Sequence, residues 1–451
     1  MAEKLWGGRF KKQMDADFER FSKSIHYDYQ LAEYDLLHTK IHTIALRNSG
    51  IFTDQEADKV LKTLDVLLLD IEKDGFKQYM DCEDVHTAIQ NRLEEKIGTL
   101  VLKLHTLRSR NDQVVFDEKL FCKKKAFYIA TLLTGILENL QVLANKYSKQ
   151  AFPGYTHLQR AQVVRFTDYL QAYYKMFNRD RERLVNFAQK LYTYIGSGAL
   201  AGTCLKCSDY SQAIKEVLAG TDIEHIGVVD NPLDNVSSRD FIVEFLSILS
   251  IAQMHLCRIA EDFILYSTQE FNYFDLPEEF CTGSSLMPHK KNPDFLELVR
   301  GHTGIVNGNL ISLLTSLKAM PLTYNRDLQL DKPPLFSSIG IIEDELTIMG
   351  KFILGIKLNE VVINKALDDQ RFYATELAEF LVFKGVAFKD AHNIVGRLIR
   401  YAEDEKIKIK DISDEKLKTF HHELNRENVR KIMCSEYAVK TKKSILRNKG
   451  Q

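Results

Sequence analysis

The chain has 451 residues and a formal net charge of −1, with 45% hydrophobic and 27% charged residues. This length is too great for one hydrophobic core, so we expect two or three domains. The balanced charge argues against nucleic acid or a membrane surface as a partner, and no uninterrupted apolar run approaches the ~18 residues of a membrane-spanning helix.

The predicted secondary structure is almost wholly helical. Proline is scarce, with 8 residues, and neither glycine nor proline interrupts residues 155–195 or 233–276. Windows this long predict helices of about 30 residues, ~45 Å in length. We therefore predict an all-α chain with three helical domains. They comprise an N-terminal domain (1–107), a central bundle of long helices (108–358) and a small C-terminal domain (359–451).

The second of these windows predicts a helix that is apolar over much of its circumference. Apolar residues recur at three- and four-residue steps from Phe241 to Phe263, and several flanking positions are apolar as well. Such a helix must be buried on several sides, either deep in a bundle or against other subunits.

The N-terminus and the cysteines indicate a cytoplasmic protein. The N-terminus lacks an apolar segment and carries acids early, so we expect no signal peptide. The seven cysteines are scattered, which favours reduced thiols over a disulfide framework. Cys204 and Cys207 have C-x-x-C spacing, but no further ligands follow at zinc-site spacing and the region gives no βαβ signal, so we interpret the pair as coincidental.

Four segments have an unusual density of polar side chains. Residues 104–113 place two arginines and an amide at a predicted helix start, which suits either an anion site or a capped, ion-paired helix. In residues 153–162 a Pro-Gly turn precedes a histidine at a predicted helix opening, where a structural role is the alternative to catalysis. Residues 283–294 (GSSLMPHKKNPD) form a predicted mobile loop that could gather donors around a developing oxyanion, or be a solvated turn. Residues 324–332 hold an aromatic hydroxyl, an amide and a lysine.

These segments together resemble the argininosuccinate lyase family of the fumarase/aspartase superfamily. The matching blocks are KLWGGRF (4–10), DVHTA (84–88), LHTLRSRNDQ (104–113), PGYTHLQRAQ (153–162), GSGALAG (196–202), GSSLMPHKKNP (283–293), TYNRDLQLDK (323–332) and ATELAEFLVFKG (374–385). They occur in the family's order, and beyond residue 385 the resemblance fades.

The resemblance implies cleavage of argininosuccinate to L-arginine and fumarate, the last step of arginine biosynthesis, without metal or organic cofactor. It also implies a homotetramer whose central helices form one bundle. In that arrangement the segments around Asn111, His157 and Ser284 meet from three different chains, so the active sites are shared.

The resemblance also implies roles for individual residues. Ser284 is the base, Lys290 and Asn292 stabilise the doubly charged carboxylate intermediate, and His157 delivers a proton to the leaving nitrogen or orients the group that does so. The implied substrate-binding residues are Ser24, His86, Arg110, Asn111, Thr156, Arg239, Tyr324, Gln329 and Lys332.

The sequence departs from the family pattern at a few positions. Leu107 replaces a glycine, His289 replaces a glutamine, Leu330 replaces an acid, and a C-terminal Gly-Gly-Thr is missing. None of these removes an implied catalytic residue. The alternatives are another fumarate-releasing lyase, such as adenylosuccinate lyase, aspartase or fumarase, and a non-catalytic crystallin-like protein on the same scaffold.

Overall fold

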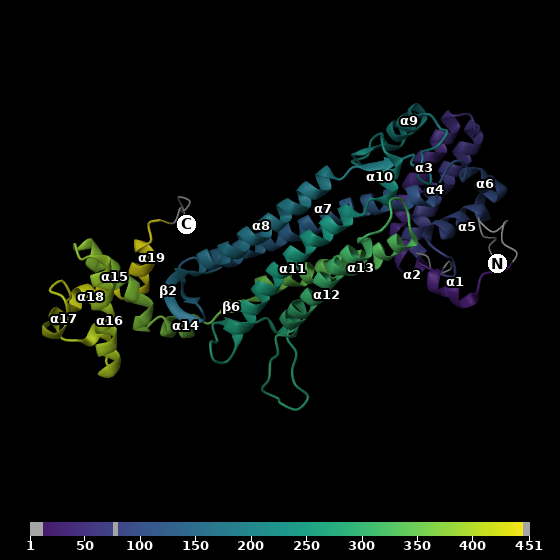
Figure 1. The fold of residues 1–451 in the computed structure, drawn as a ribbon. Coiled ribbons are helices and arrows are strands. Elements are labelled where there is room, and N and C mark those ends of the chain that lie inside the picture. The colour runs from purple at the N-terminus through teal and green to yellow at the C-terminus, as the bar shows by residue number, and fades with distance from the viewer. Residues whose placement is uncertain (1–11, 75–79, 445–451) are drawn as a thin grey trace. The chain divides into compact units, whose positions relative to one another are not determined.

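The structure, a computed structural model, describes residues 12–74 and 80–444. Helices dominate it, and the described strands form only two-stranded sheets (Figure 1). The predicted all-α fold class is therefore confirmed. The KLWGGRF block at residues 4–10 lies outside the described residues.

Short helices precede the first long one. They are α1 (Ala16–Ser22), α2 (Ile25–Asp28), η1 (Tyr29–Leu31), α3 (Ala32–Asn48), α4 (Asp54–Asp74), α5 (Val85–Ile97), η3 (Gly98–Leu100) and α6 (Val101–Leu104). In α3 most side chains are buried, histidines and an aspartate among them. This helix packs against α4 and α5, which follow it in the sequence, and against the distant α9 (Cys207–Leu218).

Five long helices form the middle of the chain. They are α7 (Arg110–Lys146), α8 (Phe166–Lys190), α11 (Asp240–Ser267), α12 (Asp294–Leu317) and α13 (Lys332–Gly355). At 37 residues, α7 is about 55 Å long at 1.5 Å per residue. The apolar helix predicted around residues 241–265 is α11, and its periodic residues Phe245, Leu249, Leu256 and Phe263 are buried.

Shorter elements connect and follow these helices. Between them lie β1 (Ala151–Thr156), β2 (Gln159–Arg165), β3 (Thr193–Ile195), β4 (Ile226–Val228), α10 (Pro232–Ser237), β5 (Phe274–Asp275), η4 (Glu278–Phe280) and η5 (Arg326–Asp331). After them come β6 (Lys357–Leu358), α14 (Glu360–Ala366), η6 (Gln370–Tyr373), α15 (Ala374–Phe383), α16 (Phe388–Asp404), η7 (Ile409–Asp411), α17 (Asp414–Phe420), α18 (Arg426–Ile432) and α19 (Ser435–Thr441).

The chain divides into two compact units. The first unit comprises Met1–Thr131, Asp180–Gln253 and His302–Asp344, and the second comprises Leu132–Arg179, Met254–Gly301 and Glu345–Gln451. In each of the five long helices, one part belongs to the first unit and the other part belongs to the second. The three-domain division drawn from the sequence stays a prediction.

An aromatic cluster forms the core of the second unit. Phe152 in β1 contacts Phe166, Tyr266 and Phe274, with ring centroids 5.4–5.8 Å apart. These distances are typical of offset and edge-to-face pairs, which contribute beyond the apolar area that they bury. The cluster fixes the strands β1 and β2 to α8 and α11.

Two sequence-based interpretations are wrong in detail. Residues 155–156 and 159–165 belong to the antiparallel strands β1 and β2, with a turn at residues 157–158. They do not belong to the helix predicted from residue 155, and α8 begins only at Phe166. The region after residue 193 does contain a small βαβ unit, because β3 and β4 pair in parallel with α9 between them. Cys204 and Cys207 therefore lie at the entrance of a crossover helix, and both are exposed free thiols.

Two described helices, α7 and α11, are long and apolar enough to cross a membrane by length and composition alone. Core helices of soluble proteins pass the same test. In α7 the carboxylate of Glu118 is fully buried, and in α11 Asp262 accepts hydrogen bonds from Tyr169 and Tyr173. Partnered acids of this kind favour core helices over lipid-facing ones.

Candidate active site

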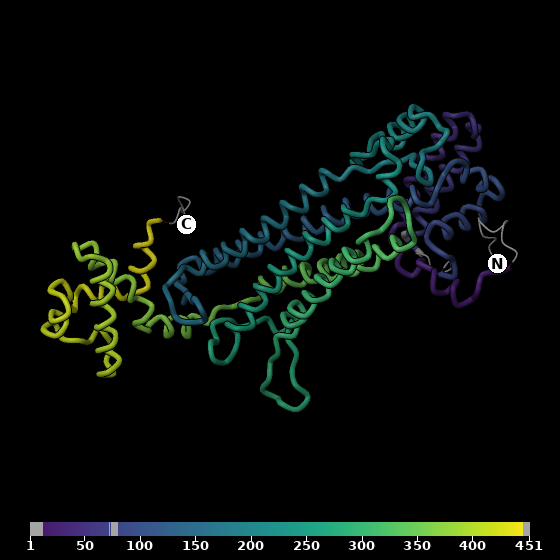
Figure 2. Tube along the Cα trace, viewed as in Figure 1, coloured from purple at the N-terminus to yellow at the C-terminus, as the bar shows by residue number. Residues whose placement is uncertain are grey.

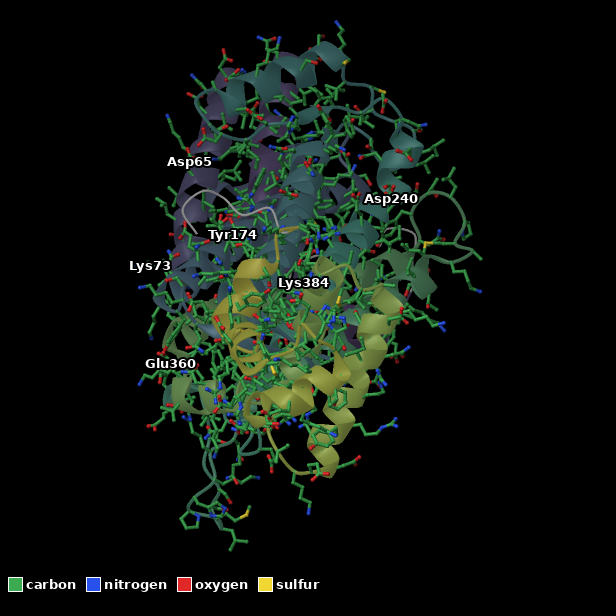
Figure 3. All side chains as sticks on the ribbon, turned by 90° about the vertical axis from the view of Figure 1, so that its left-hand side faces the viewer. Asp65, Lys73, Tyr174, Asp240, Glu360 and Lys384 are labelled. Atoms are coloured by element: carbon green, nitrogen blue, oxygen red, sulfur yellow. The ribbon has the colours of Figure 1, made fainter. Side chains whose placement is uncertain are left out.

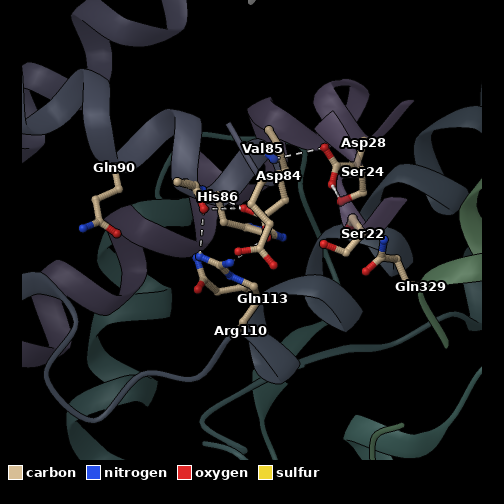
Figure 4. Close-up of polar contacts among 12 residues, drawn as sticks. Ser22, Ser24, Asp28, Asp84, Val85, His86, Gln90, Arg110, Gln113 and Gln329 are labelled. Carbon is tan, nitrogen blue, oxygen red and sulfur yellow. Dashed lines mark hydrogen bonds and ion pairs between the residues drawn. The ribbon is translucent and has the colours of Figure 1, made fainter. Parts of the chain in front are cut away.

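A buried carboxylate, Asp28, connects two N-terminal segments of the first unit (Figure 4). Asp28 Oδ2 accepts a hydrogen bond from Ser24 Oγ at 2.6 Å, and Asp28 Oδ1 accepts one from the backbone N–H of Val85 at 3.0 Å. Burial, together with the charge of nearby Asp84, raises the pKa of Asp28 to about 6. The hydroxyl of Ser24 is therefore held in place by an acid that the sequence analysis did not single out.

Asp84 joins the start of α5 to the start of α7. Its side chain caps α5 by accepting a hydrogen bond from the N–H of Thr87 at 2.8 Å, and it accepts another from Arg110 Nη1 at 2.6 Å. Burial alone would raise the pKa of Asp84, but the charge of Arg110 lowers it below its usual value. The Arg110 side chain is 31% exposed, so some of its five N–H donors remain available to an anionic ligand.

His86 lies buried between two acids. Its Nδ1 is 3.1 Å from Asp35 Oδ1 and 3.8 Å from Asp117 Oδ2. Burial raises the pKa of Asp117 well above its usual value, and the charge of Asp35 adds to this effect. The three ligand atoms lie within 4.8 Å of one another, close enough to hold a metal ion, but Asp35 Oδ1 is already engaged by Gln113 at 2.7 Å. We interpret this group as a buried ion cluster.

A second buried cluster pairs two cations with two carboxylates. Arg239 Nε is 2.5 Å from Asp331 Oδ2 and 3.1 Å from Glu118 Oε2. Lys332 Nζ is 2.6 Å from Glu118 Oε1 and 3.0 Å from Asp331 Oδ1. Burial alone would lower the pKa of Lys332, but the two carboxylates raise it well above its usual value. Lys332 and His86 both lower the pKa of Asp28 by their charge, so the two clusters are electrostatic neighbours.

The remaining candidates of the first unit join these clusters from other segments. Gln329 donates to the backbone carbonyl of Ser22 at 3.1 Å and to the hydroxyl of Tyr27 at 3.3 Å, which places it beside α1 and α2. Tyr324 is partly buried, and the charges of Lys332 and Arg239 act on its hydroxyl. Asn111 donates to the carbonyl of Ala199 at 3.0 Å, within the GSGALAG block.

Thr156 and His157 lie at the tip of the β1–β2 hairpin. Thr156 pairs with Gln159, so His157 and Leu158 form a two-residue turn, and both have a φ of +54°. A type I′ turn requires a positive φ at both central positions. Asn-Gly adopts this conformation at a lower energetic cost than His-Leu. The hairpin also needs Gly154, since a Cβ there would meet the carbonyl oxygen of Gln162 at 2.6 Å. A histidine and a leucine held in this conformation are a local strain of the kind found at functional sites.

Ser284, Lys290 and Asn292 lie on the irregular segment between η4 and α12, which projects from the ends of these elements (Figures 1 and 2). Thr282 and Asn292 close its base through two backbone hydrogen bonds of 3.1 and 2.8 Å. The Oγ of Ser284 accepts hydrogen bonds from the backbone N–H groups of Leu286 and Met287, at 3.2 and 3.0 Å. Lys290 is exposed, whereas Lys291 is paired with Asp275 at 3.0 Å.

The predicted residues fall into two groups by unit. The first unit brings together Ser24, His86, Arg110, Asn111, Arg239, Tyr324, Gln329 and Lys332. The second unit holds Thr156, His157, Ser284, Lys290 and Asn292, on two separate segments. Among the described residues, no hydrogen bond or ion pair joins the hairpin tip to the 283–292 loop.

The sequence analysis missed the acids that hold the predicted residues. Asp28 and Asp84 fix Ser24 and Arg110, while Glu118 and Asp331 pair with Arg239 and Lys332. Asp84 and Asp331 lie inside the family blocks 84–88 and 323–332, so a signal for them was present in the sequence. Asp28 and Glu118 lie outside those blocks and become visible only through tertiary contacts.

Comparisons with known proteins identify the family of this chain. A family profile described as "Lyase" matches residues 8–308, and one described as "Argininosuccinate lyase C-terminal" matches residues 372–440. The second match corrects the expectation that the resemblance fades after residue 385. It shows that the small C-terminal elements carry the family pattern as well.

Solved structures with this fold include an EDDS lyase in complex with formate, with a TM-score of 0.76 and 23% identity over 94% of this chain and 83% of that one. A class II fumarase from Schistosoma mansoni also has a TM-score of 0.76, with 15% identity over 94% and 93% of the two chains. These likenesses show the fold alone.

Closer relatives match almost from end to end. An argininosuccinate lyase from Caldicellulosiruptor saccharolyticus is 41% identical over 98% of this chain and 94% of its own length. One from Clostridium kluyveri is 42% identical over 92% and 94% of the two chains. With this identity over nearly the whole sequence, the chain belongs to the argininosuccinate lyase family of the fumarase/aspartase superfamily.

Proposed function

We propose that this protein is a carbon–nitrogen lyase that cleaves argininosuccinate into L-arginine and fumarate by β-elimination, in arginine biosynthesis. The observation that carries this proposal is the identity of about 40% with argininosuccinate lyases over nearly the full chain. Its substrate is a small molecule. We further propose that the protein acts in the cytoplasm, since its scattered cysteines favour reduced thiols.

The difficult step of this reaction is removal of a proton from carbon beside a carboxylate that is already anionic. The intermediate carries a second negative charge on that carboxylate, so catalysis needs donors and cations placed before the proton leaves. We assign the proton transfer to Ser284. A serine hydroxyl is a poor base unless its alkoxide is stabilised, and the two backbone N–H groups that donate to Ser284 Oγ supply such stabilisation. Lys290 and the amide of Asn292 then act on the intermediate's oxygens.

Substrate binding is assigned to the first-unit residues, with Thr156 added from the hairpin. Arg110 can grip a carboxylate with the N–H donors that Asp84 leaves available. Ser24, oriented by Asp28, offers its hydroxyl oxygen as an acceptor, since its proton is already donated to Asp28. Lys332 and Arg239 are paired with buried carboxylates, so we assign them to the electrostatic field of the site.

His157 is assigned to the leaving nitrogen, which must gain a proton. Its position at the tip of an exposed two-residue turn leaves the imidazole accessible, and a histidine side chain can both donate and accept a proton. It acts as the acid itself or orients the group that does so.

We propose a homotetramer in which different chains complete each site. Support comes from the face of α12, where Leu298, Ile305 and Ile311 are 58%, 48% and 60% exposed. On the same helix Gly301, Gly304 and Gly308 have open space where a Cβ would stand, which permits close helix approach. An apolar face with small residues on a long helix suits association with further copies of the chain.

The assay for fumarate release, followed by its ultraviolet absorbance, tests the activity. We expect fumarate from argininosuccinate and none from adenylosuccinate or aspartate. Fumarate from either of the other substrates would assign the chain to a different lyase of the superfamily. A folded protein that releases none from all three would support a non-catalytic role.

Complementation tests the shared sites. His157→Asn and Ser284→Ala proteins should each be inactive, and co-refolding them in equal amounts should restore about a quarter of wild-type activity, because each site draws its histidine and serine independently from different chains. Mixed tetramers that form but stay as inactive as either parent would show that each site is built within one chain.

A further inference from the structure

A cavity of about 640 Å³ lies among the C-terminal elements of the second unit. It is bounded by residues of α14, η6, η7, α18 and the start of α19, and none of the proposed active-site residues lines it. Figure 3 views the molecule from the side of these elements, with Glu360 at the start of α14 and Lys384 directly after α15. The volume falls in the range of small-molecule sites.

Charged side chains of both signs line this cavity. Lys408, Lys410 and Arg430 contribute cations, and Asp368 and Asp411 contribute carboxylates. Arg430 Nε donates to the backbone carbonyl of Lys410 at 3.4 Å, which places the guanidinium against η7. Among the described residues no ion pair joins these five side chains to one another. Their charges are therefore available to a ligand that carries both signs, with more carboxylates than cationic groups.

The cavity walls also hold the hairpin that carries His157. Asp369 lies between the lining residues Asp368 and Gln370, and its Oδ2 accepts a hydrogen bond from Arg160 Nη1 of β2 at 2.6 Å. On another wall Asn364 Oδ1 accepts a hydrogen bond from Gln150, the residue before β1, at 3.2 Å. In addition α14 packs on β1, and both η6 and α19 pack on β2. A ligand that draws the walls of the cavity together or pushes them apart would therefore move both β1 and β2.

We propose that this cavity is a second binding site for a small amino-acid derivative bearing carboxylates and cationic groups, and that its occupancy shifts the hairpin carrying His157. Argininosuccinate has this chemistry, and so in part does L-arginine. The binding half of the proposal is independent of the function proposed above. The coupling half rests on the catalytic role assigned to His157.

Calorimetric titration tests binding without catalysis. Argininosuccinate is titrated into Ser284→Ala protein, which does not consume it, and L-arginine into the wild type. We expect a site beyond the active site for one of the two probes, and its loss in Arg430→Gln and Lys410→Gln. Lys431→Gln, a matched change beside Arg430 of a residue that does not line the cavity, should keep it. The probe that binds shows which of the two compounds is the ligand of the cavity. If Arg430→Gln alters neither isotherm, there is no cavity site.

Kinetics test the coupling. L-arginine at the active site competes with substrate and raises KM, whereas cavity occupancy should change kcat severalfold, and only where Arg430 is present. Arg160→Gln should keep cavity binding but abolish the kcat change, because the link to Asp369 is lost. A kcat effect of equal size in Arg160→Gln and wild type overturns coupling through that link. A chain that binds at the cavity yet releases no fumarate would refute the proposed function alone.

Discussion

The two groups of proposed active-site residues are held in opposite ways. In the first unit Ser24, Arg110 and Lys332 are each fixed by a carboxylate at 2.6 Å, and all three carboxylates are buried. In the second unit Ser284 and Lys290 lie on a projecting loop whose hydrogen bonds are largely to its own backbone. Preorganised charges are costly to assemble but need no rearrangement on binding, whereas a loop with few buried contacts opens and closes easily.

This contrast predicts that substitutions in the loop lower the rate and leave the fold intact, whereas substitutions in the buried clusters change the free energy of unfolding.

Ser284→Ala should reduce kcat by about 10²–10⁴-fold, the usual contribution of a general base, while binding argininosuccinate and unfolding as the wild type does. Ser285→Ala, the neighbouring hydroxyl, should keep most of the activity. Steady-state kinetics and thermal unfolding check both variants. A Ser284→Ala enzyme that keeps more than about a tenth of wild-type kcat, ~1.4 kcal/mol of barrier, would reject Ser284 as the base.

Arg239→Met should destabilise the first unit by about 3–5 kcal/mol, because it leaves Glu118 and Asp331 buried with one cation between them. Arg300→Met is the matched control: its ion pair with Glu261 is largely exposed (39% and 53%), so removal should cost less than about 1 kcal/mol. Urea denaturation measures both. Equal losses in the two variants would show that burial of the cluster adds nothing.

Asp28→Asn should change how stability depends on pH. The pKa of Asp28 is raised to about 6 in the folded protein, above its unfolded value, so the wild type loses stability as pH rises from about 4 to 6 and the unfolded state releases its proton first. The Asp28→Asn protein does not lose this stability, because asparagine has no carboxyl group to titrate. The stability of wild type relative to Asp28→Asn should therefore fall by up to about 3 kcal/mol across that window and stay constant above it. A difference that does not vary with pH would mean that folding does not raise the pKa of Asp28.

The set of site residues, read from contiguous blocks, stays a prediction. The sequence predicted the fold class well, because long stretches without glycine or proline favour helices. It failed where the outcome depends on distant segments. The absence of glycine and proline after Tyr155 fitted a long helix, yet residues 155–165 pair as strands, because Phe152 of β1 packs against Phe166, Tyr266 and Phe274. Asp28 meets Val85 across 57 residues of chain, a contact that no local pattern encodes. The Ser284 loop could be predicted only as a motif, since its geometry comes from hydrogen bonds of its own backbone.

Replacing Leu107 should have the smallest effect on stability. It measures how much backbone strain the first unit tolerates beside its preorganised site. It stands where the family has glycine, and its φ is +59°, in a turn closed by the N–H of Arg108 and the carbonyl of His105 at 3.2 Å. A leucine there costs about 1–2 kcal/mol of backbone strain. Glycine removes the strain but gains freedom in the unfolded state, which offsets about 0.4–1 kcal/mol. Leu107→Gly should therefore leave stability unchanged or raise it by up to about 1 kcal/mol, whereas the β-branched Leu107→Val should lower it. Urea denaturation of the pair decides the matter: if glycine destabilises more than valine, the apolar contacts of the leucine, and not the backbone conformation, dominate at this turn.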